Sequence, residues 1–187
     1  PNIIKTFLEA HPNVNIAIKE GCCEDMDKWI SDYVVDLAIC SKPSSLNFDF
    51  IHLINDPMVA VLPLDYHLDE NISSFSVSEF NEKPFILSEK GVDYDVNKLL
   101  EQTSTHPNIV LSSRDDVTIL GMVEHGLGLA ILPDLSCKGR PGNYRTMPLE
   151  PRYSRDLGIS IRSLNNAPPI TRSFIYAIQS YFEHPEV

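Results

Sequence analysis

Hydrophobic and polar residues alternate along the chain with two different periods. Apolar positions recur every three or four residues in the stretches 1–11, 26–33 and 92–102 and after the Pro168-Pro169 pair, which predicts amphipathic helices. In the last of these, the residues expected to face inward are Phe174, Ile178, Tyr181 and Phe182. Short apolar runs or strict alternation predict strands at 14–18, 37–40, 58–62, 85–87, 109–111, 144–149 and 157–161. Helices and strands follow one another, so the pattern predicts an α/β fold with a layered sheet.

The stretch 115–133 carries the clearest local signals. Asp115 or Asp116 can accept hydrogen bonds from the first amides of a helix, and Gly126 suits the left-handed residue that closes it. The residues that follow are apolar apart from one glycine, as expected of a strand covered on both faces, and Pro133 ends that strand. The stretch therefore predicts a helix, a sharp turn and a buried strand.

Composition restricts the classes of function. The 187 residues are enough for one domain with a real core or for two small lobes. The net charge of −11 argues against binding of nucleic acid by this chain, because phosphate attraction needs a basic face. The apolar runs are far too short to span a membrane. The four cysteines contain no C-x-x-C pair, which favours buried or idle thiols in a reducing compartment over disulfides.

Six segments, in the same order, resemble the regulatory domain of LysR-type transcriptional regulators. The stretch 115–133 resembles the pattern D-x-x-T/V-x-x-x-M-V-x-x-G-x-G-I-A-I-L-P of that family. The other segments are F-L-E-A-H-P-N-V at 7–14, E-G at 20–21, D-L-A-I at 36–39, L-P-L-D-Y-H-L at 62–68 and P-F-I-L at 84–87. Together they extend over nearly the whole chain.

The resemblance implies a two-lobed, periplasmic-binding-protein-like (type 2) α/β fold with two crossover strands. Lobe I is expected to comprise residues 1–62 and 160–187, and lobe II residues 63–159. The family's domain normally opens with a strand and a Ser/Thr-bearing turn ahead of the first helix, whereas the printed sequence opens at the helix. We expect either that this strand lies on a segment outside the given sequence or that another segment takes its place in the sheet of lobe I.

Motifs of catalysis and of cofactor binding are missing from the sequence. It contains no G-x-S-x-G, no G-x-x-x-x-G-K-[ST] and no H-E-x-x-H, and the six histidines show no ligand spacing. Gly126 and Gly128 precede a strand instead of a helix, which argues against a dinucleotide site. We therefore expect no enzyme activity, no metal and no cofactor.

Small polar residues stand where open α/β sheets bind ligands, beyond the carboxyl ends of strands and near helix amino termini. Ser88 and Gly91 lie between a predicted strand and a helix, Ser113 and Thr118 surround the start of the next helix, and Ser41 follows an earlier strand. Each could equally cap a turn or helix. The resemblance favours ligand contact at Ser88 and Thr118, which match effector-contact positions of the family.

These observations predict an effector-binding (co-inducer) domain that binds a small anionic metabolite between its lobes. The resemblance further implies a cytoplasmic homodimer or higher homo-oligomer, and DNA binding only through an attached winged helix-turn-helix domain absent from this chain. The pairing would use the helix at 1–11. Two alternatives remain open, a periplasmic solute-binding protein of a transporter and an enzyme on a similar two-lobed fold. The cysteines and the 115–133 stretch disfavour the first, and the lack of paired catalytic residues disfavours the second.

Overall fold

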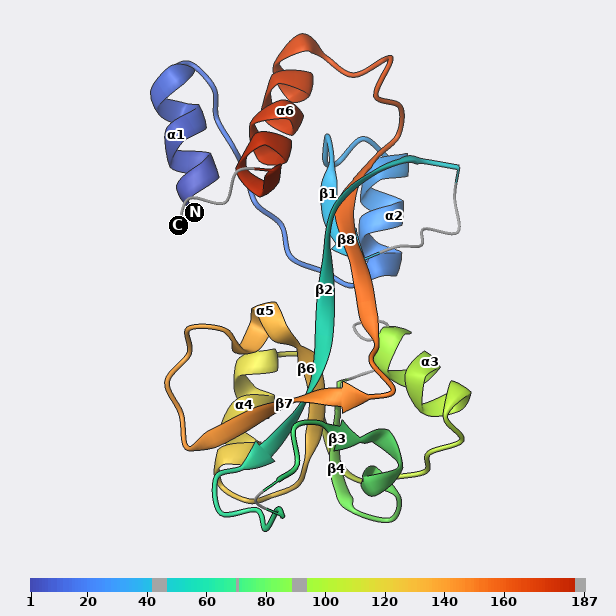
Figure 1. The fold of residues 1–187 in the computed structure, drawn as a ribbon. Coiled ribbons are helices and arrows are strands. Elements are labelled where there is room, and N and C mark those ends of the chain that lie inside the picture. The colour runs from blue at the N-terminus through green and yellow to red at the C-terminus, as the bar shows by residue number, and fades with distance from the viewer. Residues whose placement is uncertain (42–46, 70, 89–93, 184–187) are drawn as a thin grey trace. The chain divides into compact units, whose positions relative to one another are not determined.

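The computed structural model describes residues 1–41, 47–69, 71–88 and 94–183 as alternating helices and strands (Figure 1). The helices are α1 (Asn2–Ala10), α2 (Cys23–Ser31), the 3-10 helix η1 (Val77–Phe80), α3 (Tyr94–Gln102), α4 (Asp116–Glu124), α5 (Asp134–Cys137) and α6 (Pro169–Glu183). The strands are β1 (Ala38–Ser41), β2 (Asp49–Pro63), β3 (Phe75–Ser76), β4 (Pro84–Ser88), β5 (Asn108–Ser113), β6 (Ala130–Pro133), β7 (Tyr144–Glu150) and β8 (Ser154–Ile161). Within these residues, no helix has the length and apolar character needed to cross a membrane.

The chain divides into two compact units. Unit 1 comprises Pro1–Ile54 and Asp156–Val187, and unit 2 comprises Asn55–Arg155. The chain passes between the units within β2 and again within β8. Both passages lie earlier in the chain than the expected lobe boundaries at 62/63 and 159/160. An apolar run can mark a buried strand, but it does not show where a long strand leaves one core and enters the next.

Unit 1 is held together by apolar residues of β8 and α6. β8 pairs antiparallel with β1, with Ala38 opposite Ser160. On one face of β8, the buried side chains contact α6, and Phe7 of α1 lies with its ring centroid 4.8 Å from that of Phe174. This core contains Ile159, Ile161, Ala167, Ile175 and Ile178. It thus depends on a strand and a helix from the C-terminal part of the chain.

Two expectations for unit 1 are wrong. Residues 14–18 form no strand, and Ile18 is 70% exposed. A strand needs a neighbour for its backbone groups, and among the described residues none pairs with this stretch. Of the residues of α6 expected to face inward, only Tyr181 is exposed, at 42%. Ile178 is buried, and Phe174 and Phe182 are partly buried against the core of unit 1.

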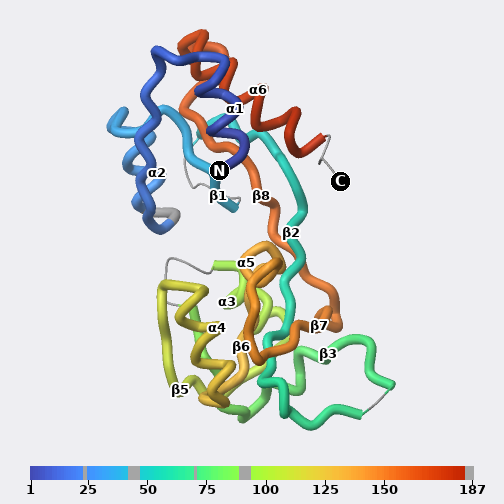
Figure 2. The backbone as a smooth tube through the Cα atoms, turned by 90° about the vertical axis from the view of Figure 1, so that its left-hand side faces the viewer, coloured from blue at the N-terminus to red at the C-terminus, as the bar shows by residue number. Residues whose placement is uncertain are grey.

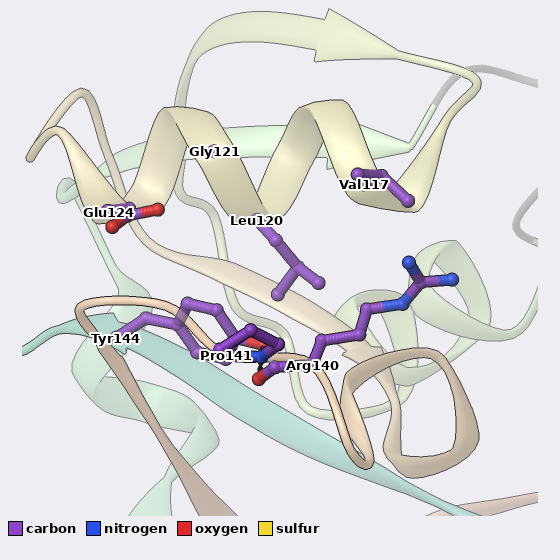
Figure 3. Close-up of a pocket in the computed structure, with 7 residues that line it drawn as sticks. All are labelled: Val117, Leu120, Gly121, Glu124, Arg140, Pro141 and Tyr144. Carbon is purple, nitrogen blue, oxygen red and sulfur yellow. Dashed lines mark hydrogen bonds between the residues drawn. The ribbon is translucent and has the colours of Figure 1, made fainter.

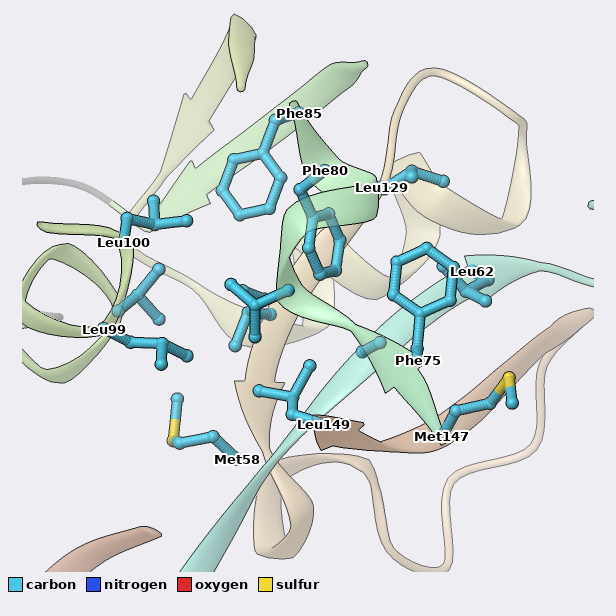
Figure 4. Close-up of a cluster of buried hydrophobic side chains, with 14 residues drawn as sticks. Met58, Leu62, Phe75, Phe80, Phe85, Leu99, Leu100, Leu129, Met147 and Leu149 are labelled. Carbon is cyan, nitrogen blue, oxygen red and sulfur yellow. The ribbon is translucent and has the colours of Figure 1, made fainter. Parts of the chain in front are cut away.

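Unit 2 is built on a strand that is buried on both faces. β2 pairs antiparallel with β6 and β7, and β3 lies parallel to β7. Met58, Ala60 and Leu62 face one core and Val59 and Val61 face the other, as the two-residue period of a strand requires. The first core is shown in Figure 4. The second contains residues of α4, which lies against β4, β5 and β6 (Figure 2).

The predictions for 115–133 are confirmed for the helix and the turn, whereas the strand expected directly after Gly126 covers only Ala130–Pro133, and Leu127 is 50% exposed. Asp115 caps α4, and Gly126 has a φ of +70°, in the left-handed region that favours glycine. At Gly128, a Cβ atom would lie 3.0 Å from the carbonyl oxygen of Pro84. The absence of a side chain there lets the chain approach β4, where the Leu129 amide donates to that same oxygen at 2.8 Å. The buried strand β6 begins one residue later.

Candidate functional site

Ser88 and Ser113 lie side by side at the carboxyl ends of two parallel strands. β4 and β5 pair so that Ser88 stands opposite Ser113. Ser88 is only 3% exposed, and its Oγ has no hydrogen-bond partner among the described residues. An unpaired buried polar group costs about 1–3 kcal/mol, so this hydroxyl, which the described residues leave without a partner, is suited to bind a ligand.

Asp115 links the end of β5 to the start of α4. Its amide donates to Ser113 Oγ at 3.2 Å. Its carboxylate accepts hydrogen bonds from the amides of Val117 and Thr118 at 3.4 and 2.9 Å and from Thr118 Oγ1 at 2.7 Å. Ser113 and Thr118 therefore both contact the same aspartate.

These hydrogen bonds determine the charge at the start of α4. The hydroxyl of Thr118, followed by its amide, holds the pKa of the Asp115 carboxyl below its ordinary value, so the group is charged at neutral pH. The amides of Val117 and Thr118, which could otherwise bind an anion at the start of this helix, are already bonded to Asp115. The start of α4 thus carries its own negative charge.

The remaining expected site residues lie elsewhere. Ser41 is the last residue of β1 in unit 1, where it pairs with Leu157. Gly91 lies outside the described residues. Within unit 2, the structure therefore brings together Ser88, Ser113 and, through Asp115, Thr118.

A separate pocket of about 250 Å³ lies on the outer side of α4 (Figure 3). The Tyr144 hydroxyl donates to the Arg140 carbonyl at 3.0 Å, and Arg140 Nε donates to the Ser136 carbonyl at 2.9 Å. These two bonds shape the segment between α5 and β7, and the Asn143 amide, which donates to Glu124 Oε1 at 3.0 Å, joins that segment to the helix. The lining residues are Val117, Leu120, Gly121, Glu124, Arg140, Pro141 and Tyr144. The sequence predicted only a loop here, since nothing local shows that it packs against α4.

A buried ion pair in unit 2 was not predicted. Asp56 of β2 is fully buried, and Arg155 of β8 donates to its Oδ2 from Nε at 3.1 Å, with Nη2 at 3.0 Å. The two residues are 99 positions apart, so no sequence spacing connects them. Also in unit 2, the Tyr153 hydroxyl donates to the buried Asp95 at 3.4 Å.

Among the described residues, no group of three or more histidine, cysteine or acidic side chains is arranged to hold a metal ion. Cys22, Cys40 and Cys137 take part in no disulfide.

The sequence profile of the LysR substrate binding domain matches residues 1–183. The chain belongs to the LysR substrate-binding domain family. It is 26% identical over 186 residues to the HTH-type transcriptional regulator YvbU of Bacillus subtilis, an alignment that covers 97% of this chain and 62% of YvbU. The chain therefore spans less than two thirds of the length of that regulator. The family resemblance inferred from the sequence is confirmed.

Solved structures of LysR domains share the fold. The regulatory domain of CcmR from Synechocystis PCC6803, in complex with 2-PG, has a TM-score of 0.88 at 18% identity, covering 98% of this chain and 90% of that one. The effector binding domain of QuiR, in complex with shikimate, has a TM-score of 0.82 at 18% identity, with coverage of 98% and 90%. The expected periplasmic-binding-protein-like type 2 fold is thus confirmed. The curated relatives of this LysR domain are transcriptional regulators, not transporter components.

Proposed function

We propose that this LysR domain binds a small anionic effector and transmits its presence to a DNA-binding domain on the remainder of a longer regulator. The family match supports a ligand-binding role, and CcmR and QuiR were each solved with a small molecule bound. Binding would shift the population of domain conformations, which is how a ligand at one site acts on another. Because the relatives are transcriptional regulators, which act on DNA, we place the protein in the cytoplasm. For the same reason we infer that it is not an enzyme and releases its effector chemically unchanged.

The observation that carries the proposal is the buried hydroxyl of Ser88, to which no described residue is hydrogen-bonded. A neutral hydroxyl can donate to a carboxylate or phosphate oxygen without a compensating cation. Ser113 is the last residue of the neighbouring strand β5 and lies opposite Ser88. The negative charge of Asp115 disfavours an anion at the start of α4, so we assign the acidic group of the effector to the Ser88 side. A contact from Thr118 stays a prediction from the family resemblance. Contacts from Ser41 and Gly91 stay predictions from their positions next to strand ends and helix starts.

Replacement of Ser88 by alanine should weaken effector binding by about 1.5–3 kcal/mol, the usual value of one hydrogen bond to a charged group. Stability should not fall, since the hydroxyl has no partner among the described residues. A panel of organic acids and phosphorylated metabolites, including shikimate, would first be screened by thermal shift. The compound that raises the Tm would then be titrated calorimetrically against both proteins.

Ser160→Ala is the matched control for loss of a buried serine hydroxyl, and it should leave the affinity for the effector unchanged. Ser160 is also a buried serine whose Oγ has no partner among the described residues, but it lies in the core of unit 1. Equal affinity in the Ser88→Ala and original proteins would contradict the assignment of Ser88. A panel in which no compound raises the Tm would count against the effector-binding proposal itself.

We further propose that the domain forms a homodimer. The resemblance implies that a helix of one lobe packs against the opposite lobe of the partner. In α1 only Phe7 is buried, while Ile4 and Leu8 form a second apolar stripe that is partly exposed. In unit 2, the strand β5 exposes Ile109, Val110 and Leu111 in succession. Both surfaces are candidates for an interface above about 1,000 Å².

The variant Leu8→Glu should be a monomer where the original chain is a dimer. A charge in an apolar interface should cost at least about 2 kcal/mol, roughly a 30-fold rise in the dissociation constant. Light scattering at tens of micromolar would measure the mass. Thr6→Glu, on an exposed position of α1, is the control for charge alone. A monomeric original chain at these concentrations would disprove the dimer.

A further inference from the structure

The short helix α5 depends on a side chain from a distant strand. Pro133 precedes α5 and provides no side-chain cap. Instead, the amide of Leu135 in its first turn donates to Asp56 Oδ1 at 3.1 Å. The other oxygen of the same carboxylate accepts from Arg155. Asp56 therefore joins α5, β2 and β8 through one buried group.

The Asp56–Arg155 pair lies where both strands leave unit 2. Asp56 and Arg155 lie next to the residues at which β2 and β8 pass from one unit to the other. α5 leads directly into the segment that carries Arg140 and Tyr144, which line the pocket beside α4. A chain of contacts thus runs from the two connecting strands to the outer side of α4.

We propose that Asp56 and Arg155 form a latch that ties α5 to β2 and β8. As a result, the position of α5 and of the segment after it depends on β2 and β8 staying paired at Asp56 and Arg155. Neither charged group is stable alone in this setting. A buried charge that loses its partner is strongly destabilising. Separation of β8 from β2 would therefore leave Asp56, which holds α5, without the positive charge that stabilises it. The latch is built from residues of unit 2 alone and requires neither effector nor dimer.

Cys137, the last residue of α5, can report on this latch. Its side chain is buried against α4 and β2 residues, including Ile119 and Val59. Burial, together with the nearby carboxylates of Asp116, Asp134 and Asp56, raises the pKa of the thiol to about 12. The thiol should therefore react with iodoacetamide only when α5 opens, since alkylation requires an exposed thiolate.

The experiment measures alkylation of each cysteine by peptide mass spectrometry in the original chain and in Asp56→Asn and Arg155→Gln. Both variants should raise the rate at Cys137 by at least about tenfold, because a buried pair is lost. Arg155 donates to Asp56 from both Nε and Nη2, so an effect of Arg155→Gln on α5 would show that β8 acts on α5 through Asp56. The double variant should add little beyond either single one, as expected of residues acting as a unit.

Two controls separate the latch from simple electrostatics. Asp134→Asn removes a carboxylate that raises the pKa of Cys137 more than Asp56 does, and Arg152→Gln removes an exposed cation near Arg155. Both should leave alkylation of Cys137 within about threefold of the original rate. Rates at Cys137 that do not change in the latch variants, or that rise equally in Asp134→Asn, would overturn the proposal. A parallel rise at Cys40 of unit 1 would assign the pair to global stability and overturn it as well.

Discussion

Replacing Phe85 by alanine is expected to destabilise unit 2 by about 3–5 kcal/mol. The Phe85 side chain is completely buried, and its ring meets that of Phe80 edge to face at a centroid distance of 5.4 Å. Phe80 in turn contacts Phe75 at 4.9 Å, so three rings from different elements pack in series (Figure 4). Removing the ring of Phe85 leaves a cavity that this layer cannot close.

The change can be assigned to its unit because the chain has a single tryptophan, Trp29, which lies in α2 of unit 1. Urea unfolding would be followed by far-ultraviolet circular dichroism and by Trp29 fluorescence. In Phe85→Ala, we expect the part of the dichroism signal that comes from unit 2 to disappear at a lower urea concentration. The transition of the Trp29 fluorescence should not move. Leu64→Ala, at an exposed position of unit 2, should shift neither signal. An equal shift of both signals in Phe85→Ala would mean that the two units unfold as one.

The sequence predicted those parts of the fold that local chemistry determines. The α4–β6 stretch is correct because a capping aspartate, a left-handed glycine and an apolar run act within a few residues of one another. The strand expected at 14–18 is wrong because an alternating pattern is only half of a strand, and the other half is a pairing neighbour. The length of β2 was underestimated because its first residues, from Asp49, are only partly buried.

In the candidate site, too, the features set by nearby residues could be predicted, and those set by distant residues could not. The position of Ser88 after a buried strand could be predicted from the order of elements, as could its place beside the end of the next strand. The burial of its hydroxyl, with no hydrogen-bond partner in the described part of the chain, could not be predicted, because burial depends on side chains from other parts of unit 2. The attachment of Leu135 to Asp56 was inaccessible for the same reason, since 79 positions separate them.

In unit 1, the largest expected effect of a single substitution is at Gly158 of β8. A Cβ atom there would lie 2.5 Å from the carbonyl oxygen of Ile51 and would also overlap the ring of Phe50. The backbone of Ile51 cannot move aside without disturbing β2, which neighbours β8 in the sheet. Valine adds two further methyl groups, so Gly158→Val should destabilise unit 1 by about 3 kcal/mol, the upper end of the usual overpacking cost.

This loss should appear as a shift of the Trp29 fluorescence transition by about 1–2 M urea to lower concentration, given the usual dependence of unfolding free energy on urea. The phase of the dichroism that belongs to unit 2 should stay in place, because the atoms nearest to the added Cβ belong to Phe50 and Ile51, on the unit 1 side of the Ile54/Asn55 boundary. Ser154→Val, at the exposed start of the same strand, tests whether a β-branched residue alone has any effect. A Gly158→Val protein with an unchanged Trp29 transition would show that β2 and β8 are not held at this distance, and that the close approach of the connecting strands is not what requires glycine here.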